Sequence, residues 1–192
     1  IVEECFRKWD RISFFYKQTK IKKALLRRIN VIDYDIVHAY TLFSDGNIAY
    51  NLKRDYKIPY VVAVRGTDVR EFFGMRKYLR RRGVKIMEEA ENVFFLSPAY
   101  KQKVITKYVP KRLRKDIEKK SVVIPNGIDD MWFDNQPDCK SEENVEAIKV
   151  AYAGQVSRNK NVDATLEALR LLERKGYSVS LSVAGVVVDE KI

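Results

Sequence analysis

One short cluster combines a guanidinium, a glycine, a hydroxyl and a carboxylate. Arg65, Gly66, Thr67 and Asp68 directly follow the apolar residues 60–64. Arg65 could clamp a phosphate or carboxylate, and Asp68 could accept a sugar hydroxyl, while Gly66 permits close approach of a ligand. In the structural alternative, Asp68 caps the next helix and pairs with Arg65. We predict that the cluster lines a binding cleft and that Arg65 and Asp68 act in catalysis.

A second polar turn, residues 154–161, precedes a predicted helix and contains Gly154, Arg158 and Lys160. Helix N-termini attract phosphate because their first N–H groups lack partners and the helix dipole is positive there. The turn matches neither a Walker A loop nor a GxGxxG fingerprint, and an ordinary capped turn with solvated cations is the alternative. We predict that Gly154, Arg158 and Lys160 bind a diphosphate.

Polar residues also follow the other apolar runs. In an open parallel sheet, ligands bind beyond the carboxyl ends of the strands. His38, the single histidine, lies within one such run; a packing role is the commoner one for such a histidine, and catalysis is the alternative that we carry. We expect the cleft to be lined by Gly66, Thr67, Ser97, Asn126 and Gly127.

Short apolar runs alternate with helical patterns along the chain. The predicted strands lie at 36–39, 60–64, 93–96, 122–124, 148–153 and 179–184, and helical patterns lie at 19–31, 48–56, 69–90, after Pro98 and at 162–175. Such alternation is typical of α/β proteins with parallel sheets. We therefore predict an α/β fold with Rossmann-like parallel sheets and helices on both faces.

A polar and acidic stretch at 128–147 separates the first four predicted strands from the last two. The strand–helix–strand pattern starts again at residue 148 and is too short for a complete domain of this type. We predict a first Rossmann-like domain over 1–140 and the beginning of a second, truncated one over 141–192.

The chain has 192 residues, 46% of them hydrophobic, and a net charge of +11. The hydrophobic share allows a real core, and the charge favours an anionic partner. Basic runs at 76–85 and 107–120 are either a solvated face or a surface that binds anionic membranes. Nucleic acid ranks last among these partners because no helix-turn-helix, zinc-finger or RNP pattern accompanies the charge.

Cys5 and Cys139 lie far apart, and no set of His, Cys and carboxylate residues has metal-ligand spacing, so we expect no bound structural metal. We also expect no cofactor. No apolar run approaches the roughly 20 residues that span a bilayer, and no signal-peptide pattern opens the chain. The first residue is Ile, so the natural start is expected upstream. The expected location is the cytoplasm, with peripheral attachment to the inner membrane face as an option.

From about Asp35 onward, the chain resembles the family 4 retaining glycosyltransferases of GT-B fold. DIVHAYTLFSDGNIAYNLKRDYKIPYVVAVRGTD is similar to their acceptor-domain core, and VFFLSPAYKQ to their serine-ended strand before a helix. SVVIPNGIDDMWF resembles the turn that leads to their interdomain linker. IKVAYAGQVSRNKNVDATLEALRLL is similar to the start of their nucleotide-binding domain.

This resemblance implies transfer from a nucleotide-sugar with retained configuration and without a metal. Lys160 matches the family's diphosphate-binding lysine; Gln155 stands where the family usually has arginine, and Arg158 could substitute for it. Arg65 takes a place that is His in many members. The family's first strand and Gly-rich loop are not visible before Asp35, and its two donor-binding glutamates would lie beyond residue 192. We expect the chain as given to be inactive alone.

Three functional hypotheses follow from these patterns. The first is a hexosyltransferase that uses a nucleotide-sugar donor and a polysaccharide or lipid-linked acceptor. The second is a non-catalytic Rossmann-like module that binds a phosphosugar or a nucleotide. The third is a basic nucleic-acid binder, whose binding to duplex DNA would depend strongly on salt.

Overall fold

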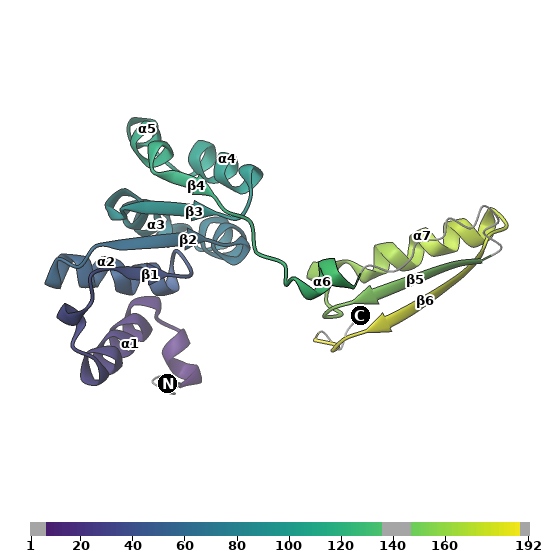
Figure 1. The fold of residues 1–192 in the computed structure, drawn as a ribbon, viewed down its shortest axis with the longest axis horizontal. Helices are drawn as coiled ribbons and strands as arrows, with labels where there is room; N and C mark the ends of the chain where they lie inside the picture. The colour runs from purple at the N-terminus through teal and green to yellow at the C-terminus, as the bar shows by residue number, and fades with distance from the viewer. Residues whose placement is uncertain (1–6, 136–146, 189–192) are drawn as a thin grey trace. The chain divides into compact units, whose positions relative to one another are not determined.

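The computed structural model describes residues 7–135 and 147–188, and the chain forms two compact units (Figure 1). Unit 1 covers Ile1–Asp129 and unit 2 covers Asp130–Ile192. The predicted domain boundary at 140/141 lies outside the described residues and stays a prediction. Cys5 and Cys139 also lie outside them.

The sheet of unit 1 is parallel, as predicted. Its strands are β1 (Val37–Ala39), β2 (Tyr60–Val64), β3 (Asn92–Phe95) and β4 (Ser121–Val123), in the order β1-β2-β3-β4. Val62 pairs with Ala39 on one side and with Val93 on the other. Because the strands are parallel, the residues that follow them come together at one edge of the sheet.

The helices of unit 1 are α1 (Phe14–Arg28), α2 (Ser44–Tyr56), α3 (Arg80–Glu89), α4 (Pro98–Lys107) and α5 (Lys111–Lys119). Two short 3₁₀ turns, η1 (Lys8–Arg11) and η2 (Val31–Asp33), flank α1. The helix predicted at 19–31 begins earlier because the Ser13 side chain caps it, accepting the Tyr16 N–H at 3.4 Å. Ser97 caps α4 in the same way, with Pro98 in the first turn of the helix.

The single helix predicted at 69–90 is three pieces: a π-helix, η3 (Asp68–Met75), a 3₁₀ turn, η4 (Lys77–Leu79), and α3. The break lies at Arg76, whose backbone is not helical. The Arg80 guanidinium donates to the carbonyls of Phe73 (2.6 Å) and Gly74 (3.1 Å) and so satisfies the end of η3. Hydrophobic periodicity does not reveal such a contact, because Arg80 and the two carbonyls are six or seven residues apart.

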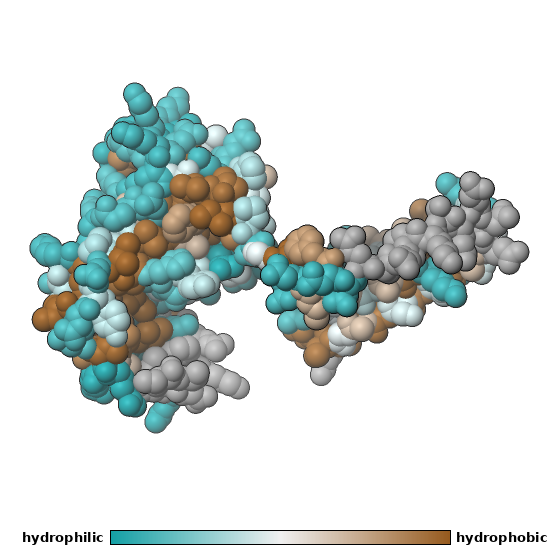
Figure 2. All heavy atoms as spheres, viewed as in Figure 1, coloured by the Kyte–Doolittle hydropathy of each residue, from teal (hydrophilic) through white to brown (hydrophobic). Residues whose placement is uncertain are grey.

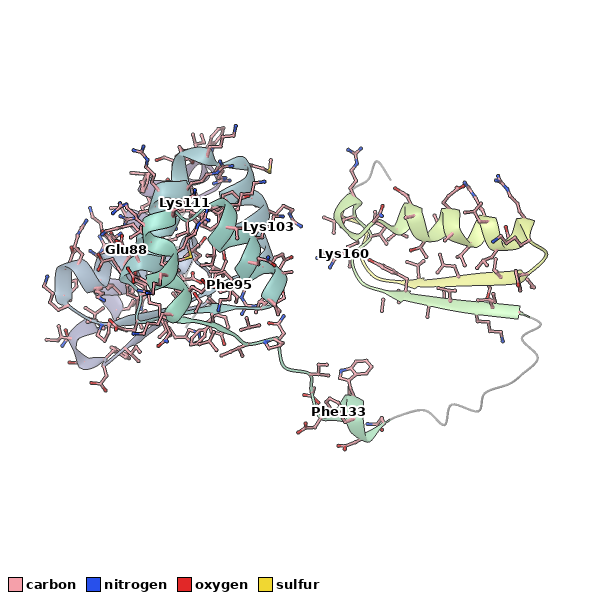
Figure 3. All side chains as sticks on the ribbon, turned by 90° about the horizontal axis from the view of Figure 1, so that it is seen from above. Glu88, Phe95, Lys103, Lys111, Phe133 and Lys160 are labelled. Atoms are coloured by element: carbon pink, nitrogen blue, oxygen red, sulfur yellow. The ribbon has the colours of Figure 1, made fainter. Side chains whose placement is uncertain are left out.

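One face of the sheet carries the core of unit 1. Val62, Val64, Val93 and Phe95 are fully buried in one cluster with apolar side chains of α2 and α3, and Figure 3 shows the helices on that side of the strands. A β-carbon at Gly83 of α3 would lie 2.5 Å from the Phe43 ring, so a glycine lets α3 pack closely there.

The opposite face of the sheet is covered by no helix among the described residues. His38 and Val122 are exposed on it, and Val61 and Phe94 are partly so. Figure 2 shows apolar side chains gathered over these strands. Within the described part of unit 1, the expectation of helices on both faces is therefore met on one face only.

Unit 2 contains a short helix α6 (Met131–Asp134), β5 (Ala147–Ala153), a 3₁₀ turn η5 (Arg158–Lys160), α7 (Val162–Arg174) and β6 (Ser178–Ala184). β5 and β6 pair in parallel along their whole length, from Ala147 with Ser178 to Ala153 with Ala184. This strand–helix–strand order agrees with the predicted start of a second Rossmann-like domain.

Candidate functional site

Arg65 connects the loops that follow three strands of unit 1. Its Nε donates to the Tyr40 carbonyl (3.0 Å) and its Nη1 to Oδ1 of Asn126 (3.4 Å). The guanidinium also lies 5.3 Å from the centre of the Tyr40 ring. The structure thus brings together Arg65 and Asn126, which were predicted for the cleft, and adds Tyr40.

Asp68 is buried, with 1% of its surface exposed. Its carboxylate accepts the backbone N–H groups of Arg65 (2.9 Å), Leu42 (3.1 Å) and Phe43 (3.2 Å). Burial raises the pKa of this carboxyl, while the three N–H donors act to lower it. The predicted contact with a sugar hydroxyl does not fit this burial. The pairing partner is the backbone of Arg65, not its guanidinium, so we correct Asp68 to a residue that positions the loops after β1 and β2.

His38 is exposed on the open face of the sheet, not packed inside. Its ring stacks on Tyr40 with 4.9 Å between centres and meets Phe94 edge-on at 6.2 Å. Tyr40 therefore links His38 to Arg65. Within the described chain, no carboxylate forms an ion pair with the His38 imidazole.

The other predicted cleft residues lie at the same edge. A β-carbon at Gly66 would lie 3.2 Å from the Tyr100 hydroxyl, so this tyrosine closes over the glycine. The Ser97 hydroxyl is already occupied by the Tyr100 N–H (3.3 Å). Thr67, Asn126 and Gly127 are exposed. Tyr40 and Tyr100 are the residues that sequence reasoning missed; the position of Tyr40 directly after β1 was the available signal.

Two glycines bring the loop after β5 close to the loop after β6. Gly154 and Gly185 have φ values of +152° and +159°, and a β-carbon at Gly185 would lie 1.7 Å from the Gly154 carbonyl oxygen. The backbones approach closely because Gly154 N–H donates to Ala184 (2.9 Å) and Val156 N–H to Val186 (3.0 Å). Any side chain at Gly185 would force the two loops apart.

Lys160 ends the turn that this loop leads into. Its N–H donates to the Ser157 carbonyl (2.9 Å), and Asn161 follows in the left-handed conformation (φ 54°) before α7 begins. Its side chain is exposed, and within the described residues its ammonium pairs with no carboxylate. Figure 3 shows Lys160 at the N-terminal end of α7. A cation, a helix start and a close glycine turn therefore share one edge, with Arg158 two residues away.

Two further observations concern metal ligands and membrane-spanning helices. In the parts of the chain that the structure describes, no three His, Cys, Asp or Glu residues are grouped so that they could hold a metal ion. Across the same residues, no helix has the length and apolarity needed to cross a bilayer.

Comparisons with known proteins agree with this architecture. Residues 5–131 match the family described as Glycosyltransferase Family 4. Among solved structures, the chain is similar to the catalytic domain of Starch Synthase IV from Arabidopsis thaliana bound to ADP and acarbose, with a TM-score of 0.57 and 16% identity. The match covers 97% of this chain and 48% of the neighbour, so the chain spans about half of that length. No curated protein sequence matches the chain.

Proposed function

The chain belongs to glycosyltransferase family 4 and has an α/β fold of the GT-B type, and we propose that the whole protein transfers a hexosyl group from a nucleotide-sugar to a sugar or lipid-linked acceptor. We further propose that the anomeric configuration is retained and that no metal is required, as the family resemblance implies. The ADP bound by the starch synthase neighbour supports a nucleoside diphosphate as the leaving group.

The observation that carries the proposal is the exposed Lys160 at the carboxyl edge of the β5–β6 sheet. As the nucleoside diphosphate leaves, negative charge builds on its oxygens. An ammonium held there before the reaction stabilises the transition state more than the ground state. The turn before α7 also presents backbone N–H groups at a helix start, where phosphate binds readily.

In this proposal unit 1 supplies the acceptor side. Arg65 is held by Tyr40 and Asn126 but retains guanidinium N–H groups for a ligand oxygen. Asp68 acts indirectly, because its three backbone hydrogen bonds set the loops that carry Tyr40 and Arg65. Exposed Tyr40 and His38 offer a ring surface of the kind that packs against the apolar face of a sugar.

A second part of the proposal places unit 1 against anionic membrane lipid at the cytoplasmic face. The basic runs divide in the structure. Arg82 donates to Asn47 (2.6 Å) and Asn51 (2.7 Å), and Arg80 caps η3, so neither is free for lipid. In the first run, Arg81 on α3 is exposed. On α4 and α5 the exposed cations are Lys103, Lys107, Lys111, Arg112, Lys115 and Lys119.

The test of the proposed transfer is a screen of nucleotide-sugars with the full-length protein, measuring release of nucleoside diphosphate with and without sugar acceptors. The proposal expects turnover with at least one donor, and anomeric analysis of the product reports retention. Binding of nucleotides or phosphosugars without turnover of any donor would favour the alternative, a non-catalytic binding module.

A further inference from the structure

A cavity of about 190 Å³ lies beside the first turn of α2 and is separate from the contacts described above. Its walls come from α1, from the start of α2 and from η3 with the residue after it. They consist of Phe14, Lys17, Gln18, Ser44, Phe72 and Arg76. Because α2 and η3 follow β1 and β2, the cavity belongs to the side of the sheet where ligands bind in open parallel folds.

One wall contains a buried polar atom that has no hydrogen-bond partner among the described residues. Gln18 is 3% exposed, and its Oε1 accepts no hydrogen bond in the described parts of the chain. Leaving a buried acceptor unpaired costs about 1–3 kcal/mol, and such atoms are rare in folded proteins. The terminal torsion of a glutamine is soft, so this oxygen can turn toward a donor that enters the cavity. A ligand hydroxyl is such a donor.

A second wall holds a guanidinium whose N–H groups form no hydrogen bond within the described part of the chain. Arg76 lies 5.0 Å from the centre of the Phe72 ring, which itself stacks on Phe43 at 4.7 Å and meets Phe14 at 6.0 Å. The ring stack therefore positions the guanidinium through a cation–π contact, which uses no N–H group. Among the described residues, no side-chain hydrogen bond of Arg76 is formed. Such a fork is suited to a carboxylate or a phosphate.

The size and remaining lining narrow the ligand further. Sites for drug-sized ligands measure about 300–1,000 Å³, so this smaller cavity suits one sugar ring better than a whole nucleotide. Lys17 adds a second positive charge, and the Ser44 hydroxyl can donate or accept. The lining combines apolar ring edges, hydroxyl-binding groups and cations within one small space.

We propose that this cavity is an acceptor subsite that takes a single sugar ring carrying an anionic group, with Arg76 binding the anion and Gln18 accepting a ring hydroxyl. The assignment rests on the proposed transfer function and names its acceptor as a phosphorylated or carboxylated sugar. Phosphate and carboxylate share this recognition chemistry, and the experiment separates them.

The test is direct titration of the full-length protein by calorimetry with four probes: glucose 6-phosphate, glucuronate, glucose and inorganic phosphate. We expect one or both anionic sugars to bind at least tenfold more tightly than glucose and than inorganic phosphate. The tighter of the two identifies the anion. Equal affinity for all four probes, or binding of none, overturns the proposal.

Two variants locate the binding. Arg76→Gln should weaken the preferred anionic sugar about tenfold and leave glucose nearly unchanged, whereas Lys77→Ala, an adjacent exposed cation, should change neither. Gln18→Leu should weaken the sugar probes but not inorganic phosphate, while the melting temperature stays equal or rises, because an unpaired buried acceptor is replaced by an apolar group. If Gln18 only supports the fold or holds a trapped water, this variant will lower the melting temperature or leave probe affinity unchanged.

Failure of this subsite and failure of the transfer function are distinguishable. Release of nucleoside diphosphate from a donor in water alone does not need an acceptor, so it should persist in Arg76→Gln. Donor turnover without preferential binding of an anionic sugar would contradict the proposed subsite and leave the proposed transfer function standing. Tight, Arg76-dependent binding of an anionic sugar without turnover of any donor would support the anionic-sugar site and contradict the proposed transfer function.

Discussion

The loop after β2 and the loop after β5 occupy equivalent places at the carboxyl ends of parallel strands, yet they are built in opposite ways. After β2, the carboxylate of Asp68 is buried and consumed by three backbone N–H groups. After β5, backbone groups at Gly154 approach the loop that contains Gly185 after β6, and the Tyr152 hydroxyl donates to the Gln155 carbonyl (2.8 Å). No charged side chain is used in these contacts, and the charged Lys160 remains exposed. A charged residue in a loop on the ligand side of the sheet can therefore either hold the loop in place or remain exposed to a ligand.

The difference separates residues that hold a loop from residues that can meet a ligand. A buried carboxylate with three donors rigidifies two loops but has little capacity left for substrate. An exposed ammonium contributes little to the fold but acts on a diphosphate where charge develops. The variants below test whether activity and stability divide between the two loops in this way.

The largest expected effect belongs to Lys160. In the full-length protein, Lys160→Ala should lower kcat about 10²–10³-fold, or about 2.7–4 kcal/mol, because one preorganised partner of the developing charge is lost. The melting temperature should stay the same. Steady-state kinetics with the best donor measures this, and Lys175→Ala, an exposed lysine after α7, is the matched control.

Arg158→Ala sharpens the same test. A loss similar to that of Lys160→Ala would show that Arg158 replaces the arginine that Gln155 lacks, whereas a nearly silent change would make it a bystander. Wild-type turnover in Lys160→Ala would show that Lys160 does not act on the diphosphate, and the proposed difference between the two loops would be wrong.

Asp68 should show the reverse pattern. Asp68→Ala leaves two buried N–H groups and one partly buried N–H group without an acceptor, and we expect unit 1 to lose about 2–3 kcal/mol of unfolding free energy. Asp68→Asn keeps one oxygen and should lose less. Urea unfolding followed by circular dichroism measures both, with exposed Asp45→Asn as the control. An unchanged midpoint in Asp68→Ala would contradict the positioning role.

The two units should also differ in their attraction to lipid. Each cation near an anionic surface is worth about 1 kcal/mol, so Lys111→Ala with Lys115→Ala should weaken binding to phosphatidylserine vesicles about 30-fold at low salt. Vesicle co-sedimentation measures this. Lys149→Ala with Lys175→Ala removes the same charge from unit 2 and should have little effect. Equal losses in both variants would argue against a lipid face on α5.

The smallest expected effect is an acid dependence at the rim of unit 1. Arg54 and Lys22 lower the pKa of Asp55 to about 2, and the Lys22 contact joins α1 to α2. A lowered folded-state pKa stabilises the fold above the unfolded value, near 3.8, and this contribution is lost as pH falls toward 2. Asp55→Asn should cost under about 1 kcal/mol at pH 7, because the pair is partly exposed, and progressively less as pH falls through 2. A difference that grows toward pH 2 would contradict this sign.

The elements that sequence reasoning recovered depend on local patterns. Continuous apolar runs separated by helical periods predicted the four parallel strands of unit 1 and the β5–α7–β6 order of unit 2. The errors have long-range causes. Asp68 is buried by Leu42 and Phe43, about 25 residues away, and Arg82 is satisfied by Asn47 and Asn51 on a different helix. These long-range hydrogen-bond partners can be identified only from the folded structure.

The candidate site divides in the same way. The exposed position of Lys160 in a polar turn between an apolar run and a helix was readable from neighbouring residues. The cluster of Tyr40, Arg65 and Asn126 was readable only in part, because it depends on which strand ends are neighbours. The Gln18 cavity was not readable, since its walls come from three separate segments between residues 14 and 76.

The most direct measurement of the central claim is a titration of nucleoside diphosphates into three full-length proteins: wild type, Lys160→Ala and Lys175→Ala. If the loop after β5 holds the donor's diphosphate through Lys160, the best-bound nucleoside diphosphate should bind at least tenfold more weakly to Lys160→Ala, and equally well to wild type and Lys175→Ala. The same Kd for all three proteins would contradict the account.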